Sequence, residues 1–216
     1  RRHVGEPHAK SLHLGATSQD VIDTSLVLRL SDVCNILRDR IVGLLAHLDQ
    51  LTERFGARGL MGRTRMQAAI PITVRDRLAA WRAPLSLHLV RLGEIEDRLL
   101  RVQLGGAAGT LERMQGKGPE LAARLAEILG LRCSRPWHSD RSSLVEFGDW
   151  LSLLCGSLGK IGQDIALMAQ NGIGEVTLSG GGSSSAMPHK QNPVGAEILV
   201  SLGRYSGVLA GGMHQA

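Results

Sequence analysis

Aromatic residues are scarce in this chain: Phe, Trp and Tyr make up 3% of it, whereas apolar residues make up 43%. Proteins that bind single-stranded nucleic acid stack bases on aromatic side chains and carry clustered basic residues. Here the formal charge of +5 and the pI near 9.6 arise from basic residues scattered among acidic ones, as in Arg38-Asp39-Arg40. The composition therefore argues against a nucleic-acid partner and favours helices that pack through aliphatic side chains.

Cysteine and long apolar runs are also scarce. The three cysteines, Cys34, Cys133 and Cys155, are widely spaced and odd in number, so we expect no disulfide framework. Cys133 and His138 lack the paired spacing of a zinc site, and no metal is expected. No apolar run reaches membrane-spanning length, so we expect no membrane partner. Together these absences predict a cytoplasmic protein.

Apolar spacing predicts one very long helix near the start of the chain. Between Thr17 and Phe55 apolar residues recur about every 3.6 residues, at positions 26, 30, 33, 37, 41, 44, 48, 51 and 55. Thr17 or Ser18 can cap the start of this helix. A nearly straight helix of this length needs other long helices to bury its apolar stripe.

The rest of the chain also has mainly helical patterning. Further helices are predicted for residues 71–104, 119–129 and 139–171, and from residue 194 onward. Pro84 is expected to kink the first of these. Glycines at 56, 59 and 62 break the chain before it, and a short strand pair near this break is the main β-structure expected. The fold class is therefore all-α, a bundle of long helices.

Residues 180–193 carry the densest cluster of chemically useful side chains. A triple glycine precedes Ser183-Ser184-Ser185-Ala186-Met187-Pro188-His189-Lys190-Gln191-Asn192-Pro193. Glycines let a backbone approach an anion closely, and a lysine with loop N–H groups can stabilise the alkoxide that proton transfer by a hydroxyl requires. A Gly/Ser-rich linker is the alternative interpretation. The Met-Pro-His-Lys-Gln-Asn-Pro run directly behind the serines favours the catalytic one.

This stretch resembles the signature loop of the fumarase/aspartase superfamily, G-S-S-x-M-P-x-K-x-N-P. Aligned on Met187, the superfamily's catalytic serine falls on Ser184, its lysine on Lys190 and its asparagine on Asn192. The resemblance implies that Ser184 transfers a proton while Lys190 and Asn192 stabilise developing negative charge. Ser185 and Met187 are expected to contact the substrate.

The segment from His13 to Asp20 resembles the superfamily's first conserved region, H-x-G-x-T-S-x-D. The resemblance implies that Thr17 and Ser18 hold a substrate carboxylate and that His13 lies in the active site. A helix N-terminus suits this task, because its free N–H groups and its dipole attract anions. Simple capping by Thr17 or Ser18, with His13 as a lead-in residue, is the alternative interpretation.

The segment from Gly62 to Pro71 resembles the second conserved region, commonly G-R-T-H-x-Q-x-A-x-P. By this resemblance Arg63, Thr64 and Gln67 contact the substrate. Arg65 replaces the histidine that serves acid–base chemistry in many members. An arginine stays protonated near neutral pH, but it can bind a carboxylate or sulfonate bidentately. Argininosuccinate and adenylosuccinate lyases, which use a histidine there, therefore become poorer matches.

Within the superfamily, residues 15–24, 105–110 and 136–141 resemble the bacterial 3-carboxy-cis,cis-muconate cycloisomerases. This implies an enzyme that lactonizes 3-carboxy-cis,cis-muconate, or an analogue such as 3-sulfomuconate, in aromatic-compound degradation. The substrate is then a small di- or tricarboxylate whose own carboxylate is the electron sink, so no cofactor is expected. His138 and Arg141 are expected to serve helix-start packing and a salt bridge.

The resemblance also implies a homotetramer whose active sites combine regions from three chains. Residues 1–216 are then expected to form the central helical-bundle domain, lacking part or all of the N- and C-terminal cap domains of longer members. Three alternatives stay open: another superfamily lyase of the adenylosuccinate or argininosuccinate type, a non-catalytic structural oligomer, and a generic helical interaction module.

Overall fold

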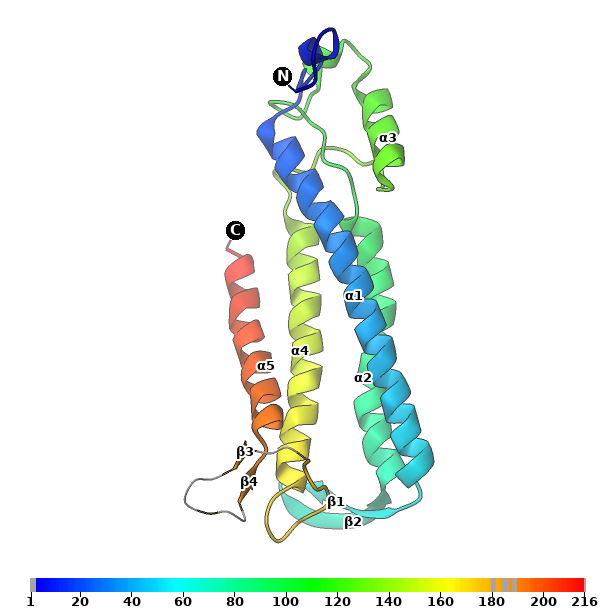
Figure 1. Ribbon diagram of the computed structural model, residues 1–216, viewed down its shortest axis with the longest axis vertical. Coiled ribbons are helices and arrows are strands. Elements are labelled where there is room, and N and C mark those ends of the chain that lie inside the picture. The colour runs from blue at the N-terminus through cyan, green and yellow to red at the C-terminus, as the bar shows by residue number, and fades with distance from the viewer. Residues whose placement is uncertain (1–2, 180–181, 184–186, 188–189, 216) are drawn as a thin grey trace. The chain divides into compact units, whose positions relative to one another are not determined.

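The computed structural model is mostly helical, as expected, and it describes residues 3–179, 182–183, 187 and 190–215 (Figure 1). In chain order the elements are the 3-10 turn His8–Lys10, α1 (Ser18–Phe55), β1 (Gly59–Thr64), β2 (Gln67–Thr73), α2 (Val74–Leu99), the 3-10 turn Glu112–Met114, α3 (Gly118–Leu129), α4 (Ser142–Met168), β3 (Gly182–Ser183), β4 (Gln191–Asn192) and α5 (Val194–Met213). None of the helices in the described ranges is long and apolar enough to span a bilayer.

The chain divides into two compact units. The first unit holds residues 1–37 and 93–144, and the second holds residues 38–92 and 145–216. Helices α1, α2 and α4 each contribute residues to both units. The candidate residues are therefore divided between the units: the start of α1 belongs to the first, whereas the β1–β2 hairpin and the signature loop belong to the second.

Helix α1 has the predicted length, but its buried face coincides with the predicted stripe only in part, at positions such as Ile41 and Leu48. Of the stripe positions, Val33 is 38% exposed and Leu51 is 42% exposed. The buried residues of α1 are Asp20, Asp23, Thr24, Val27, Cys34, Ile41, Leu45 and Leu48. The exposed surface of this helix also carries apolar residues, such as Val21 and Ile22. Apolar spacing alone therefore predicts the helix but identifies its buried face only in part.

Helix α2 is shorter than predicted at both ends. It begins at Val74 and not at Pro71, because residues 67–73 pair with β1 as the second strand of a hairpin. It ends at Leu99, because the chain then pairs with residue 132: the N–H of Val102 donates to the carbonyl of Arg132, at 2.9 Å. The expected strand pair is confirmed, and Pro84 lies inside a continuous helix.

Helix α4 is shorter than predicted by three residues at each end. At its start Asp140 accepts a hydrogen bond from the N–H of Ser142, at 3.0 Å, and the hydrogen bonds from Ser142 lower the pKa of Asp140. At its end the N–H of Glu175 donates to the carbonyl of Met168, at 2.9 Å, which turns the chain away from the helix axis. Both ends are therefore closed by hydrogen bonds that helical periodicity does not reveal.

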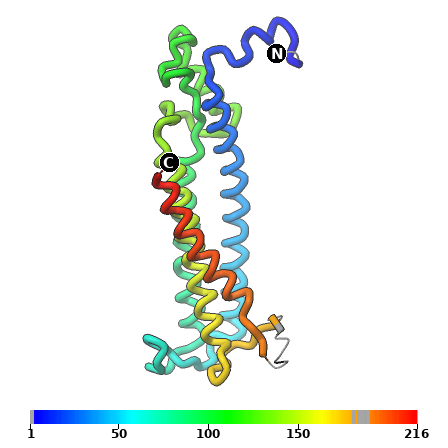
Figure 2. The backbone as a smooth tube through the Cα atoms, turned by 90° about the vertical axis from the view of Figure 1, so that its left-hand side faces the viewer, coloured from blue at the N-terminus to red at the C-terminus, as the bar shows by residue number. Residues whose placement is uncertain are grey.

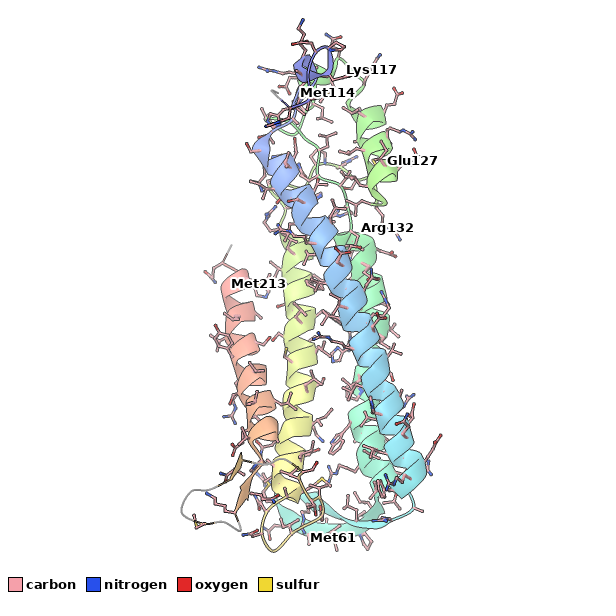
Figure 3. The ribbon with its side chains drawn as sticks, in the orientation of Figure 1. Met61, Met114, Lys117, Glu127, Arg132 and Met213 are labelled. Carbon is pink, nitrogen blue, oxygen red and sulfur yellow. The ribbon has the colours of Figure 1, made fainter. Side chains whose placement is uncertain are left out.

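Helices α4 and α5 lie side by side in the second unit (Figures 1 and 2). A Cβ atom on Gly162 would lie only 2.6 Å from the carbonyl oxygen of Ala196, so the two backbones approach as closely as a glycine permits. At the other end of α5, Met213 (Figure 3) packs over Gly148, where a Cβ atom would lie 2.3 Å from its sulfur. Glycines on α4 therefore determine how closely α5 approaches it.

Candidate active site

In the first unit, three candidate residues lie at or just before the start of α1. His13 is exposed and has a left-handed backbone, with φ of 63°. Thr17 is half-buried immediately before the helix, and Ser18 is its exposed first residue. A 38-residue helix leaves its first N–H groups without intrahelical partners and directs its positive dipole end here. This end of α1 can therefore bind an anion such as a carboxylate.

Asp20 anchors this end of the helix from within the first unit. Its side chain is buried, at 3% exposure, and accepts four hydrogen bonds. Oδ2 accepts the backbone N–H groups of Thr17, at 2.9 Å, and Gly106, at 3.0 Å. Oδ1 accepts the backbone N–H of Gly105, at 2.9 Å, and the Nε2 amide of Gln103, at 3.0 Å. A buried carboxylate with this many donors has its hydrogen-bonding capacity satisfied, and it joins the start of α1 to the segment of Gly105 and Gly106.

Gln103 extends the network and is itself fully buried. Its Oε1 accepts the backbone N–H of Trp137 at 2.6 Å, and its Nε2 lies 3.3 Å from Nδ1 of His138. Its backbone exchanges two hydrogen bonds with the hydroxyl of Thr24, at 2.9 and 3.0 Å. Every polar group of Gln103 therefore has a partner, and its side chain has one favourable orientation.

Asp23, one turn further along α1, forms a separate charge pair. Both of its oxygens accept hydrogen bonds from the guanidinium of Arg141, each at 2.9 Å, and Oδ1 also accepts the Nε2 amide of Gln19, at 2.9 Å. The Arg141 guanidinium also lies 5.5 Å from the Trp137 ring centroid. The expectation that Arg141 forms a salt bridge is confirmed, and its partner is a carboxylate with no exposed surface.

Neither the apolar periodicity nor the motifs of the sequence predict these supporting residues. Asp20 appears only as the last letter of the H-x-G-x-T-S-x-D motif, and no motif gives a role to Asp23 or Gln103. A signal was present: positions 20, 23, 24 and 27 share one face of a helix. Because three of the four are polar, an apolar pattern does not include them.

In the second unit, the second conserved region forms the β1–β2 hairpin. Thr64 pairs directly with Gln67, so these two residues flank the turn, and Arg65 and Met66 form it. Their φ values are 50° and 67°, as a type I′ turn requires at both central positions. A left-handed arginine is uncommon, and such conformations cluster at functional sites. The turn therefore presents the Arg65 side chain on an exposed tip.

Arg63 lies on β1 beside this turn. Its guanidinium is 3.7 Å from the carboxylate of Glu175, which is largely buried. Glu175 lies in the segment between α4 and the signature loop. The ion pair thus links the second conserved region to the segment that precedes the signature loop, and it partly neutralises the charge that Arg63 can offer to an anion.

The signature loop is closed by a short antiparallel ladder. Gly182 of β3 pairs with Asn192 of β4, and a Cβ atom on Gly182 would lie 2.7 Å from Val194. Lys190 and Met187 are exposed, and the backbone N–H of Lys190 donates to the carbonyl of Met187, at 2.9 Å. Both two-stranded sheets lie at the same end of the second unit (Figure 1). Ser184 and Ser185 lie outside the described residues.

Other kinds of site find no support in the described part of the chain. No three side chains among its histidines, cysteines, aspartates and glutamates are placed to hold a metal ion. Cys34, Cys133 and Cys155 form no disulfide within the described part of the chain. The described candidates are thus hydroxyl, amide, imidazole and cationic groups, which suit the binding of an anionic organic molecule.

A family model described as lyase matches residues 4–205. The chain therefore belongs to the fumarase/aspartase family of lyases.

Individual relatives agree with this assignment. The chain is 44% identical over 194 residues to 3-carboxy-cis,cis-muconate cycloisomerase of Pseudomonas aeruginosa, covering 88% of this chain and 42% of that protein. The crystal structure of 3-carboxy-cis,cis-muconate lactonizing enzyme from Pseudomonas putida matches with a TM-score of 0.87 and 42% identity, over 96% of this chain and 46% of that one. The structure of fumarate lyase from Mesorhizobium sp. BNC1 matches with a TM-score of 0.87 and 34% identity, over 97% and 47%. The chain thus spans about half the length of these relatives.

Proposed function

We propose that this chain is the central helical domain of a cofactor-independent cycloisomerase. Its substrate would be 3-carboxy-cis,cis-muconate or a close analogue such as 3-sulfomuconate, converted to a muconolactone during aromatic-compound degradation in the cytoplasm. The observation that carries the proposal is the 44% identity to a 3-carboxy-cis,cis-muconate cycloisomerase. The geometry adds an anion-binding helix end and an exposed hairpin arginine, which suit a small di- or tricarboxylate.

The reaction would be an intramolecular addition followed by protonation. One oxygen of a substrate carboxylate forms a C–O bond to a carbon of the diene, and the displaced electron pair moves to the adjacent carbon. That carbon lies next to a second carboxylate, which accepts the charge as an enediolate. Ser184 then delivers a proton to this carbon and regains one from water. Lys190 and Asn192 stabilise the enediolate, because preorganised donors act most strongly where charge develops.

The remaining candidates would hold the substrate. Thr17 and Ser18 bind one carboxylate at the positive end of α1, and His13 positions the substrate or transfers a proton. Arg65 pairs with a carboxylate or sulfonate, for which a planar guanidinium is well suited. The other substrate contacts proposed are Arg63, Thr64, Gln67, Ser185 and Met187.

We also propose that the protein is a homotetramer with active sites shared between chains. Extensive exposed apolar surface supports self-association. On α1 the exposed residues are Val21, Ile22, Val33, Ile36, Val42 and Leu51, and on α5 they are Val194, Ile198, Leu202, Tyr205, Val208, Leu209 and Met213. Sedimentation analysis of the full-length protein is expected to give a tetramer, and a monodisperse monomer would contradict this part of the proposal.

The activity is tested by following the loss of conjugated-diene absorbance of 3-carboxy-cis,cis-muconate. The full-length assembled protein is expected to turn the substrate over, and Ser184→Ala to abolish turnover. Ser139→Ala, a substitution at an exposed serine before α4, is the matched control and should leave turnover intact. Full turnover by Ser184→Ala would rule out the serine-centred mechanism. If the assembled parent is inactive on this diene but active on 3-sulfomuconate, Arg65 has shifted the specificity.

A second candidate is a β-eliminating lyase of the same family. The observation that favours it is the match to a solved fumarate lyase at 34% identity with the same TM-score as the lactonizing enzyme. Formation of fumarate from adenylosuccinate or argininosuccinate, without turnover of either muconate, would decide for this candidate. A protein that turns over none of these substrates would instead fit a structural oligomer.

A further inference from the structure

Asp20 makes more hydrogen bonds than capping a helix requires. A capping carboxylate in the first turn reaches back to one backbone N–H, and Asp20 does so with Thr17 at 2.9 Å. Its other three hydrogen bonds come from Gln103, Gly105 and Gly106, which lie 83 to 86 residues further along the chain. The carboxylate therefore joins two distant segments in addition to capping its own helix.

These two segments also meet backbone to backbone. A Cβ atom on Gly106 would lie 2.6 Å from the carbonyl oxygen of Gly15, and one on Gly15 would lie 2.7 Å from Cε of Met114. Both glycines have positive φ, 67° and 69°, which side chains rarely adopt. Contact at this distance leaves no room for a side chain between Gly15 and Gly106. The relative placement of the two segments in the first unit is therefore narrowly specified.

Gln103 stabilises the contact between the two segments through its own hydrogen bonds. Its Nε2 amide donates to Asp20, and its Oε1 accepts from the backbone N–H of Trp137. Exchanging the amide oxygen and nitrogen would set two acceptors against each other at Asp20 and two donors at Trp137. The orientation of Gln103 is thus determined by its partners, and in turn it fixes one oxygen of Asp20.

We infer that Asp20 and Gln103 are positioning residues for the substrate carboxylate. They hold Thr17 and Ser18 at a fixed place against the Gly105–Gly106 segment, so that the hydroxyls and free N–H groups at the start of α1 are preorganised. Their role is to place Thr17 and Ser18, without contact between their own side chains and the substrate. The claim that they position a substrate carboxylate rests on the proposed function, whereas the hydrogen bonds that join the two segments are a property of the first unit alone.

The charge of Asp20 allows a positioning role to be distinguished from an electrostatic one, because its charge and its hydrogen bonds are expected to change KM in opposite directions. A negative charge one turn from the start of α1 opposes the binding of an anion there. Asp20→Asn removes that charge, and it also replaces an acceptor with an amide that faces N–H donors. If Asp20 acts only through its charge, the substitution lowers KM. If it acts by positioning, the substitution raises KM despite the lost charge.

The test measures kcat and KM for the diene in the full-length assembled protein. Asp20→Asn, and separately Gln103→Met, are expected to raise KM about tenfold or more while kcat changes less, since each loses buried hydrogen bonds that place the carboxylate site. Leu99→Ala is the matched control, because Leu99 is a buried apolar residue of the same unit. It should lower the stability comparably and leave KM unchanged. A KM that falls or stays constant in both test variants overturns the inference.

Amide hydrogen exchange gives a second readout that needs no activity. In the parent, the amides of Gly105 and Gly106 are expected to be protected, and Asp20→Asn should accelerate their exchange more than that of the other amides in the unit. Leu99→Ala should accelerate exchange evenly over the unit. Unchanged exchange at Gly105 and Gly106 in Asp20→Asn overturns the positioning role. Selective acceleration in a protein that turns over no diene would instead uphold the link and reject the proposed function.

Discussion

The two units support their candidate residues in different ways. In the first unit, Thr17 and Ser18 lie next to a buried hydrogen-bond network in which Asp20 alone accepts four hydrogen bonds. In the second, Arg65 lies on an exposed turn, and neighbouring Arg63 reaches one carboxylate at 3.7 Å. The first unit can therefore preorganise an anion site by itself. We expect the exposed side chain of Arg65 to be fixed by the substrate or by a neighbouring copy, which is what a site shared between chains would provide.

The largest expected effect is on the buried charge pair between Arg141 and Asp23, beside the network. Arg141→Met leaves the fully buried carboxylate of Asp23 without its cation, and we expect the free energy of unfolding to fall by about 3 kcal/mol. The matched change in the second unit is Arg82→Met, which breaks the half-exposed pair with Asp49 and should cost far less, because solvent screens that pair. Urea unfolding of both variants measures the difference. Equal losses would mean that the first unit is no more dependent on its buried charges than the second.

Ser18→Asp tests the start of α1 as an anion site. The new carboxylate would repel a substrate carboxylate, and kcat/KM should fall about 100-fold, whereas stability should hold because acidic residues suit a helix N-terminus. Ser25→Asp, two turns further along the exposed surface of α1, adds the same charge and should change kcat/KM little. Similar losses in both variants would point to long-range charge and not to a site at the helix end.

At the hairpin tip, stability and binding should change in opposite directions. Arg65→Asn removes the cation and should raise KM about tenfold, the effect of one lost ionic hydrogen bond. Asparagine also tolerates a left-handed backbone better than arginine, so the free energy of unfolding should rise by about 0.5 kcal/mol. Met66→Asn, at the other left-handed turn position, should give the same stabilisation without the change in KM. An unchanged KM in Arg65→Asn would remove Arg65 from the site.

The smallest expected effect concerns a buried histidine in the second unit. His88 is 2% exposed, its Nε2 lies 2.9 Å from the hydroxyl of Ser157, and its Nδ1 is buried with no hydrogen-bond partner among the described residues. Burial lowers the pKa of His88, and the nearby charge of Arg91 lowers it further. The unfolded chain gains a proton near pH 6.5 that the folded chain does not.

Stability should therefore fall as the pH drops below about 6.5, and His88 should have no such effect above it. In His88→Leu the hydroxyl of Ser157 keeps its bond to the carbonyl of Leu153. We expect the stability lost between pH 7.5 and 5.5 to be about 1 kcal/mol smaller in this variant than in the parent. Parallel stability profiles for the two proteins would contradict this.

The fold was predictable from the sequence where local periodicity determines it. Helix α1 begins and ends within a residue of its predicted bounds, and α3 ends at Leu129, where the following Gly130 has the positive φ of a helix cap. The overpredicted ends of α2 and α4 depend on hydrogen bonds to distant or irregular segments, such as that between Val102 and Arg132. Spacing along the chain carries no information on such partners.

The candidate site was predictable only in part, for a related reason. Motifs identified the exposed hydroxyl and cationic groups, because their order along the chain is distinctive. They did not reveal that Asp20 and Gln103 meet, since 83 residues separate them and neither belongs to an apolar stripe. The left-handed backbone of Arg65 also depends on the register of the hairpin, which the motif does not state.

The most direct test of the account is whether the candidates of both units serve one catalytic site. Ser18→Asp and Ser184→Ala proteins, each with little or no turnover alone, would be unfolded, mixed in equal amounts and refolded together, and diene turnover would be measured. If each site takes these two residues from different chains, about one quarter of the sites should be intact and turnover should return to about that fraction of the parent. A mixture that stays inactive, although its chains demonstrably exchange, would contradict the shared site.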